Sequence, residues 1–173
     1  MPEFELPRGA SIFKDVTFGW EHRNAEGELI AKGDPHHLDL VPNASLSWLS
    51  SQIAGTVSGS ASYICLGTAT ATPTMGDITL GGEITGSGLS RASASTSGVG
   101  NVQGTASAAT TNQTTGSFYV YYTFTASGSV TVNEAGVGQS STFNAGVVAH
   151  DLLSPAASMT AGDTLFASFQ FIL

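Results

Sequence analysis

Residues 118–125 read FYVYYTFT, and their large side chains alternate with the two-residue period of a β-strand. The alternation divides the side chains between two faces: Phe118, Val120, Tyr122 and Phe124 on one, and Tyr119, Tyr121, Thr123 and Thr125 on the other. Residues 163–173, DTLFASFQFIL, repeat the pattern and direct inward Leu165, Ala167, Phe169 and Phe171. A strand this apolar would aggregate unless it were paired inside a sheet, so we expect it to close the fold against a partner early in the body.

The composition favours one small β-domain and excludes several classes of protein. The chain has 173 residues, of which 10% are charged, against roughly 25% in an average soluble protein. Abundant Thr, Val, Phe and Tyr argue for strands rather than a helical bundle. Two Lys and three Arg are too few to follow a nucleic-acid backbone, and a single cysteine excludes a disulfide within the chain. The predicted fold class is all-β, an antiparallel β-sandwich or jelly roll with one short helix.

Charge divides the chain into an extended N-terminal arm or hairpin, residues 1–42, and a β-sandwich body, residues 43–173. The first 40 residues hold four of the five basic residues and eight of the thirteen acidic ones. Within them, residues 16–23 and 28–32 flank the sequence NAEG, whose Gly27 can supply the positive φ of a hairpin loop. The N-terminus does not resemble a secretion signal, and no run of about 18 apolar residues predicts a membrane span.

One short helix is expected at about residues 43–54, with Asn43 as a suitable N-cap. Its apolar face would consist of Leu46, Leu49 and Ile53. A helix of three turns is marginal alone, so it must dock against the body. The apolar run 62–66 predicts a buried strand in which Cys65 packs as a small hydrophobic residue. Residues 81–117 are rich in Ser, Thr, Ala and Gly, and are compatible with a strand or with a mobile loop.

The densest group of metal-ligand residue types lies just before the expected helix. It consists of Asp34, His36, His37 and Asp39. Adjacent histidines point apart in an extended chain and seldom bind one ion. A polar loop is therefore the favoured interpretation, and no metal site is predicted.

Three other patterns contain residue types found in catalytic or nucleotide-binding sites, but these residues are not spaced along the chain as such sites require. His150, Asp151 and Ser154 are chain neighbours, which rarely form a catalytic triad, and no Gly-x-Ser-x-Gly elbow supports them. Glu83 and Glu134 would form a glycosidase pair only if the fold brought them together, and Glu134 is better explained as an acceptor of backbone N–H bonds at a bulge. The stretch GVGNVQG misses the dinucleotide fingerprint by one residue. We predict no catalytic residues and no cofactor.

Aromatic and apolar side chains indicate an interaction surface instead. The candidate interface residues are Phe18, Trp20, His37, Leu38, Tyr119 and Tyr121. Tyr and Trp are enriched where subunits meet, which favours a protein interface. The alternative is an exposed sugar-binding face formed by Trp20, Tyr119 and Tyr121.

The order of short motifs resembles a family of small virion structural proteins of tailed bacteriophages, described as capsid decoration, cement or head-fibre-like proteins. The resemblance spans nearly the whole chain and rests on the sequences FGW (18–20), NAEG (24–27), HL (37–38), LVPN (40–43) with the helix after it, YICLGT (63–68), TPTMGD (72–77), EI (83–84), Arg91, NEAGV (133–137) and MTAGDTL (159–165).

This resemblance implies a non-enzymatic protein made in the host cytoplasm and bound to the outer surface of the capsid. Its partners would be the major capsid protein, whose subunits it would bridge, and copies of itself in a dimer or trimer. Neither nucleic acid nor membrane would be contacted, and the family has no catalytic residues to transfer. The alternative function is a head-fibre or tail-associated module that binds glycans of the host receptor.

Overall fold

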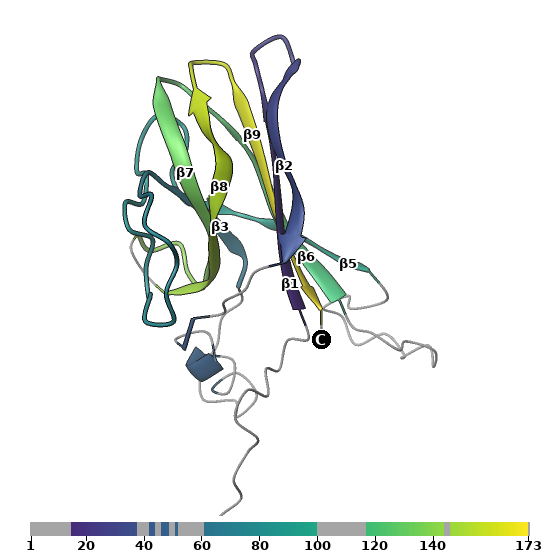
Figure 1. Cartoon of the computed structure of the whole chain (residues 1–173), viewed down its shortest axis with the longest axis vertical. Coiled ribbons are helices and arrows are strands. Elements are labelled where there is room, and N and C mark those ends of the chain that lie inside the picture. Colours follow the sequence, from purple (N-terminus) through teal and green to yellow (C-terminus); the bar gives the residue numbers. More distant parts are fainter. Residues whose placement is uncertain are drawn as a thin grey trace, which may run out of the picture.

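A computed structural model describes residues 15–37, 42–43, 46–48, 51, 61–99, 117–143 and 146–172. Its strands form two antiparallel sheets that pack face to face (Figure 1). The first sheet has the order β2 (Leu29–His37), β1 (Asp15–Arg23), β9 (Thr164–Ile172), β6 (Ser117–Thr125), β5 (Ser95–Val99). The second has the order β4 (Ala92–Ser93), β3 (Tyr63–Gly67), β7 (Val130–Gly138), β8 (Val147–Met159). The all-β sandwich is confirmed, whereas the jelly-roll alternative is not.

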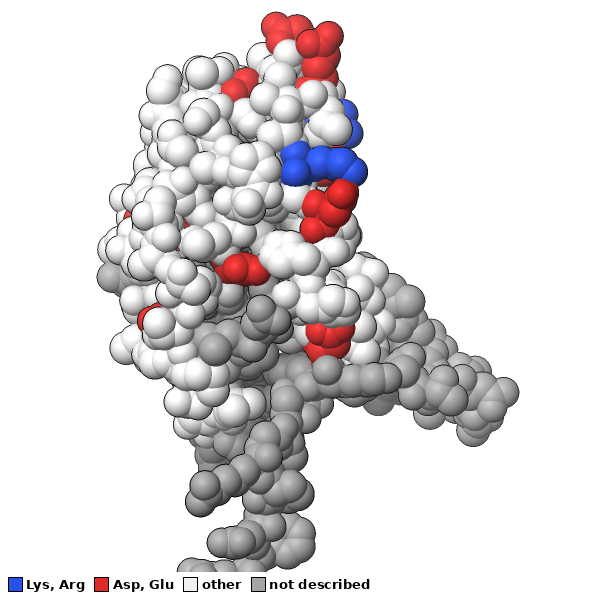
Figure 2. All heavy atoms as spheres, in the orientation of Figure 1, with Lys and Arg blue, Asp and Glu red and all other residues white. Residues whose placement is uncertain are grey.

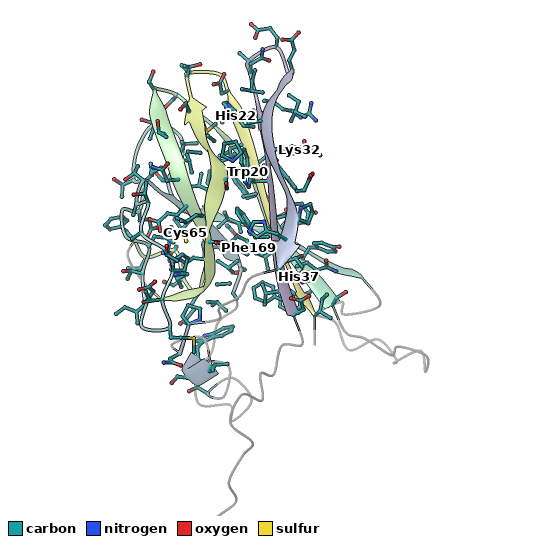
Figure 3. The ribbon with its side chains drawn as sticks, viewed as in Figure 1. Trp20, His22, Lys32, His37, Cys65 and Phe169 are labelled. Atoms are coloured by element: carbon teal, nitrogen blue, oxygen red, sulfur yellow. The ribbon has the colours of Figure 1, made fainter. Side chains whose placement is uncertain are left out.

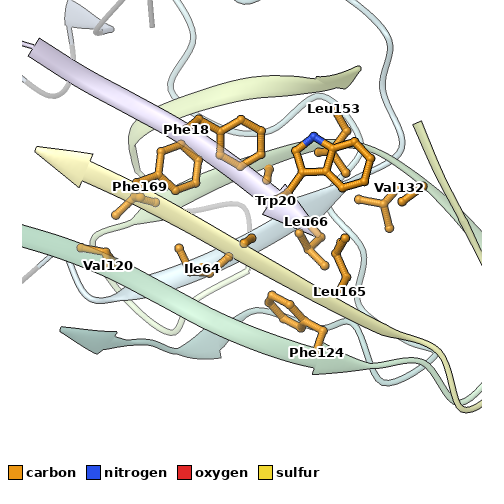
Figure 4. Close-up of a cluster of buried hydrophobic side chains, with 14 of the residues drawn as sticks. Phe18, Trp20, Ile64, Leu66, Val120, Phe124, Val132, Leu153, Leu165 and Phe169 are labelled. Carbon is orange, nitrogen blue, oxygen red and sulfur yellow. The ribbon is translucent and has the colours of Figure 1, made fainter. Parts of the chain in front are cut away.

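The predicted faces of β6 and β9 are confirmed. Val120, Phe124, Leu165 and Phe169 are at most 1% exposed and lie between the sheets (Figure 4). The opposing face of the second sheet supplies Ile64, Leu66 and Val137, which are fully buried. Because inward and outward positions alternate along a strand, β9 gives every second side chain to this core, whereas β2 at the edge of the first sheet is mostly exposed.

The structure corrects the separation of an N-terminal arm from the body. The hairpin predicted within residues 16–32 is present, and Gly27 in its turn has a φ of 85°. However, β1 also pairs along its whole length with β9, from Asp15 opposite Ile172 to Arg23 opposite Thr164. This hairpin is therefore part of the five-stranded sheet, because its strand β1 lies between β2 and β9. The charged residues of β1 point outward, and they make the whole segment look like a solvent-exposed arm in the sequence, although its other face is buried.

The helix is seen at Asn43, Leu46–Trp48 and Ser51, and the rest of the predicted span 43–54 lies outside the described residues. Trp48 packs against the main core, as expected for a helix too short to be stable alone. No helix among the described residues is long and apolar enough to cross a membrane. Of the uncertain stretch 81–117, residues 92–93 and 95–99 are strands β4 and β5, and residues 100–116 lie outside the described part.

A long loop, residues 68–91, covers the outer face of the second sheet. It is fixed by main-chain hydrogen bonds from Thr68 N to Gly82 O (2.9 Å) and from Val147 N to Ile78 O (3.0 Å). Under it, Leu80 joins Cys65 and Val147 in a second, smaller hydrophobic cluster. Cys65 is fully buried, as its apolar run predicts, and burial raises the pKa of its thiol to about 12. The loop thus creates a second interior on the far side of this sheet.

Candidate functional site

Two of the six predicted interface residues belong to the core. Phe18 is fully buried and stacks on Phe169 with ring centroids 4.7 Å apart. Trp20, labelled in Figure 3, is 2% exposed. A Cβ added at Gly33 of the neighbouring strand β2 would meet its indole ring. A side chain enclosed between the two sheets of its own chain cannot also contact another subunit, so the interface role predicted for Phe18 and Trp20 is corrected.

Asp34, His36 and His37 lie on strand β2 rather than in the polar loop that their sequence favours, and they are divided among separate ion pairs. His37 is exposed on β2 and contacts Asp15. His36 contacts Asp151 of β8, with 2.7 Å between Nε2 and Oδ2, and so joins the edges of the two sheets. Within the described residues, no three His, Cys, Asp or Glu side chains are arranged to hold a metal ion. Leu38, a predicted interface residue, and Asp39 lie outside the described part.

Tyr119 and Tyr121 lie on the outer side of the first sheet. Both are half-buried on the outer face of β6, the face opposite to the core. Phe166 of β9 joins them, because its ring centroid lies 6.1 Å from that of Tyr121. We call these three residues the outer aromatic row. Phe166 was missed, although the alternation that places Leu165 inward also places Phe166 outward.

The charged side chains leave few free cations on the described surface. Figure 2 shows acidic groups at the tip of the β1–β2 hairpin and the visible basic groups beside β2. Each described Lys or Arg contacts an acid: Arg23 contacts Glu21, Lys32 contacts Asp34, and Arg91 contacts Glu83. The face around the aromatic row carries mainly uncharged partners such as Ser168 and Gln170.

Glu83 is engaged by a buried guanidinium and is therefore unavailable as one member of a carboxylate pair. Arg91 donates through Nε to Oε1 at 2.7 Å and through Nη2 to Oε2 at 2.9 Å. Its Nη1 donates to the carbonyl of Ser140 at 2.9 Å. Burial is the largest single influence and would lower the pKa of Arg91, but the hydrogen bonds to Glu83 and the charge interactions with Cys65 and Glu83 together outweigh it, and the pKa is raised. The ion pair links two positions of the covering loop, and the bond to Ser140 ties the loop to the segment that follows β7, so this geometry indicates a structural role.

A cavity of about 320 Å³ lies between the covering loop and the outer face of the second sheet. Three titratable side chains line it: Asp77 from the loop, Glu134 from β7 and His150 from β8. Nε2 of His150 lies 3.2 Å from Oδ2 of Asp77, and Nδ1 lies 3.9 Å from Oε2 of Glu134. Neither contact has hydrogen-bond geometry, and both ring nitrogens are buried without a hydrogen-bond partner. These three residues are far apart in the sequence, and only the covering loop and the pairing of β7 with β8 bring them together. No local sequence pattern therefore indicates the cavity.

The two carboxylates of the cavity are held by main-chain donors. The amide of Thr74 donates to Asp77 at 2.6 Å, and this bond is the largest cause of the lowered pKa of Asp77. The amide of Gly82 donates to Oε1 of Glu134 at 3.0 Å. Glu134 thus accepts a backbone N–H bond beside a register shift of β7, as its sequence context predicts. Asp151 pairs with His36 and lies on the opposite face of β8 from His150, so no His150–Asp151–Ser154 triad is assembled.

Comparison with known proteins adds no relationship. No protein-family model, curated protein or solved structure matches the chain.

Proposed function

We propose that the chain is a non-enzymatic structural protein of a tailed-bacteriophage virion that decorates the outer capsid surface and bridges major capsid subunits. The outer aromatic row is the observation that carries this proposal. Half-buried tyrosines on a rigid sheet offer a large contact area at a small cost in side-chain entropy, and they are typical of the energetic centres of protein interfaces. The motif order described above supplies the identity of the partner.

The architecture supports a mechanical role. Strands β1, β9 and β6 form a continuous antiparallel ladder whose inner side is fully packed, so a load applied to the outer face is spread over many main-chain hydrogen bonds. The bridging element in this proposal is the sheet itself. Deleting residues 1–40 would remove β1 and β2, and would disrupt the sheet rather than release an independent arm.

The test is co-sedimentation of the purified chain with capsids that are assembled from the major capsid protein of the same genome and stripped of accessory proteins. We expect saturation at a simple ratio to the major capsid protein. The variant Tyr121→Ser should bind at least about tenfold more weakly, a loss of about 1.4 kcal/mol. Thr123→Ser, an exposed change on the same strand face, is the control. Absence of binding, or equal binding by both variants, would overturn the proposal.

A glycan-binding function is the second candidate, because the same half-buried tyrosines can stack on sugar rings. A glycan array separates the two functions. Binding to defined glycans that is lost in Tyr119→Ser and Tyr121→Ser, together with occupancy of only a few copies per particle, would favour a head-fibre or tail-associated receptor-binding module.

A further inference from the structure

The cavity under the covering loop contains a buried imidazole whose hydrogen-bonding groups are unused. His150 is 4% exposed, and neither of its ring nitrogens has a hydrogen-bond partner. A neutral imidazole has one donor and one acceptor nitrogen, and leaving such groups buried and unpaired costs free energy. The fold therefore keeps an unsatisfied side chain at the wall of a cavity, between two carboxylates.

The cavity brings two carboxylic side chains together without a described Lys or Arg beside them. Glu134 has a side chain that is 2% exposed, and its described hydrogen bond is the one from Gly82 to Oε1. Asp77 is held ionised at neutral pH, because main-chain donation lowers its pKa. All Lys and Arg side chains within the described ranges contact other acids, as shown above. A carboxylate can accept about four hydrogen bonds, so acceptor positions remain open.

The walls of the cavity suit a compact guest. Its volume of about 320 Å³ is at the lower end of the range for small-molecule sites, roughly 300–1,000 Å³. Small side chains such as Ala71, Gly76 and Gly81 leave this space open, and Thr72 and Thr79 line it as well. Asp77 is fixed by Thr74, so the site is formed before a ligand arrives.

We propose that this cavity binds a compact organic cation, a guanidinium or primary ammonium group, whose N–H donors are shared by Asp77, Glu134 and the acceptor nitrogen of His150. A guanidinium carries five N–H donors in a planar fork, and an ammonium carries three. Either group would donate to the acceptor nitrogen of the imidazole and would place a positive charge beside the two carboxylates. The cation can belong to a free small molecule or to an Arg or Lys side chain of a docking protein. The site is on the outer face of the second sheet, so it is independent of the aromatic row.

The experiment follows the imidazole signals of His150 by NMR in the full chain while methylguanidinium or n-butylammonium is added. Methylurea and n-butanol, which have similar shapes and no charge, are the control ligands. We expect a saturable shift of His150 with the two cations only. Binding should weaken at least tenfold in Asp77→Asn and in Glu134→Gln. It should be unchanged in Asp151→Asn, which alters the His36 pair on the other face of the same strand.

Asp77→Asn protects the test against misfolding, because this side chain is about one-third exposed (32%) and leaves the buried Glu134 in place. A glycine tripeptide with a central arginine distinguishes the two sources of the cation. Binding of the tripeptide admits a protein side chain, whereas exclusion of the tripeptide with retention of methylguanidinium indicates a free small molecule. Either result supports the proposal.

Three results would overturn it. The first is a His150 signal that does not respond to either cation. The second is an equal response to methylurea, which would show that charge is not recognised. The third is saturable binding of Zn²⁺ without binding of the organic cations, which would make the site a metal site.

Discussion

Replacement of Arg91 by methionine tests whether the covering loop is held by a buried ion pair. The side chains of Arg91 and Glu83 are 3% and 0% exposed, so removal of the guanidinium leaves the carboxylate buried without its charged partner. The carbonyl of Ser140 also loses its hydrogen bond from Nη1. The methionine fills much of the same space, so the effect reports mainly on lost pairing rather than on a cavity.

The expected cost of Arg91→Met is about 3–5 kcal/mol, the range for removing one partner of a buried pair. For a chain of this size, each kcal/mol lowers the melting temperature by about 2–4 °C, so the expected fall is roughly 6–20 °C. Arg91→Lys should recover only part of this loss, because an ammonium cannot make the two parallel bonds to Glu83. Glu83→Gln combined with Arg91→Met should be more stable than Arg91→Met alone, because no unpaired charge remains.

The assay is urea unfolding of the wild type and the variants, followed by circular dichroism. Arg23→Met is the matched control, because Arg23 forms the same kind of pair with Glu21 at the surface, where the two side chains are 44% and 43% exposed. An exposed pair contributes about 0–1 kcal/mol. If Arg91→Met destabilises the protein no more than Arg23→Met does, the reasoning about burial is refuted.

Three further predictions concern other parts of the fold. Because burial raises the pKa of Cys65 to about 12, a thiol reagent should modify it only at the rate of unfolding, and fast modification of the native protein would contradict this burial. Donation from the amide of Thr160 is the largest cause of the lowered pKa of Asp163. The ionised Asp163 therefore contributes its full stabilisation above the ordinary pKa of 3.8, and this contribution is lost as the pH falls below that value. In Asp163→Asn, the free energy of unfolding measured in urea should depend less on pH in that acid range. A Cβ at Gly33 would lie 2.2 Å from Nε1 of Trp20, so Gly33→Ala should cost about 1–3 kcal/mol in thermal melts, whereas Gly86→Ala, which meets open space, should have little effect.

The strands with strong alternation could be predicted from the sequence. In β6 and β9 the large apolar residues occupy every second position, and their inward faces are those of the structure. The pairing partner of β9 was only partly predictable. Sequence favoured a partner early in the body, and β9 instead pairs with β6 and with β1 from the charged leader. Strand pairing over such separations depends on packing of the whole sheet and leaves no local signal.

The candidate sites also differ in how far the sequence predicts them. The outward positions of Tyr119 and Tyr121 follow from local alternation, whereas burial of Trp20 depends on β9 and on the second sheet. The cavity could not be predicted, because Asp77 reaches His150 only when the covering loop lies over β7 and β8. A Gly-Asp turn and an isolated histidine are common in loops and strands, so neither indicates a binding site by itself.

The central position of β9 sets the order of events during synthesis. Until residues 164–172 are available, the β1–β2 and β5–β6 hairpins have no strand between them, and the facing edges of β1 and β6 remain unpaired. The nascent chain therefore carries two incomplete half-sheets until β9 has been synthesised. Pairing across most of the chain gives a high contact order, which slows folding, and open edges can recruit strands from neighbouring copies during this interval. The time at which β9 becomes available for pairing would therefore influence how much of the chain reaches the folded sandwich.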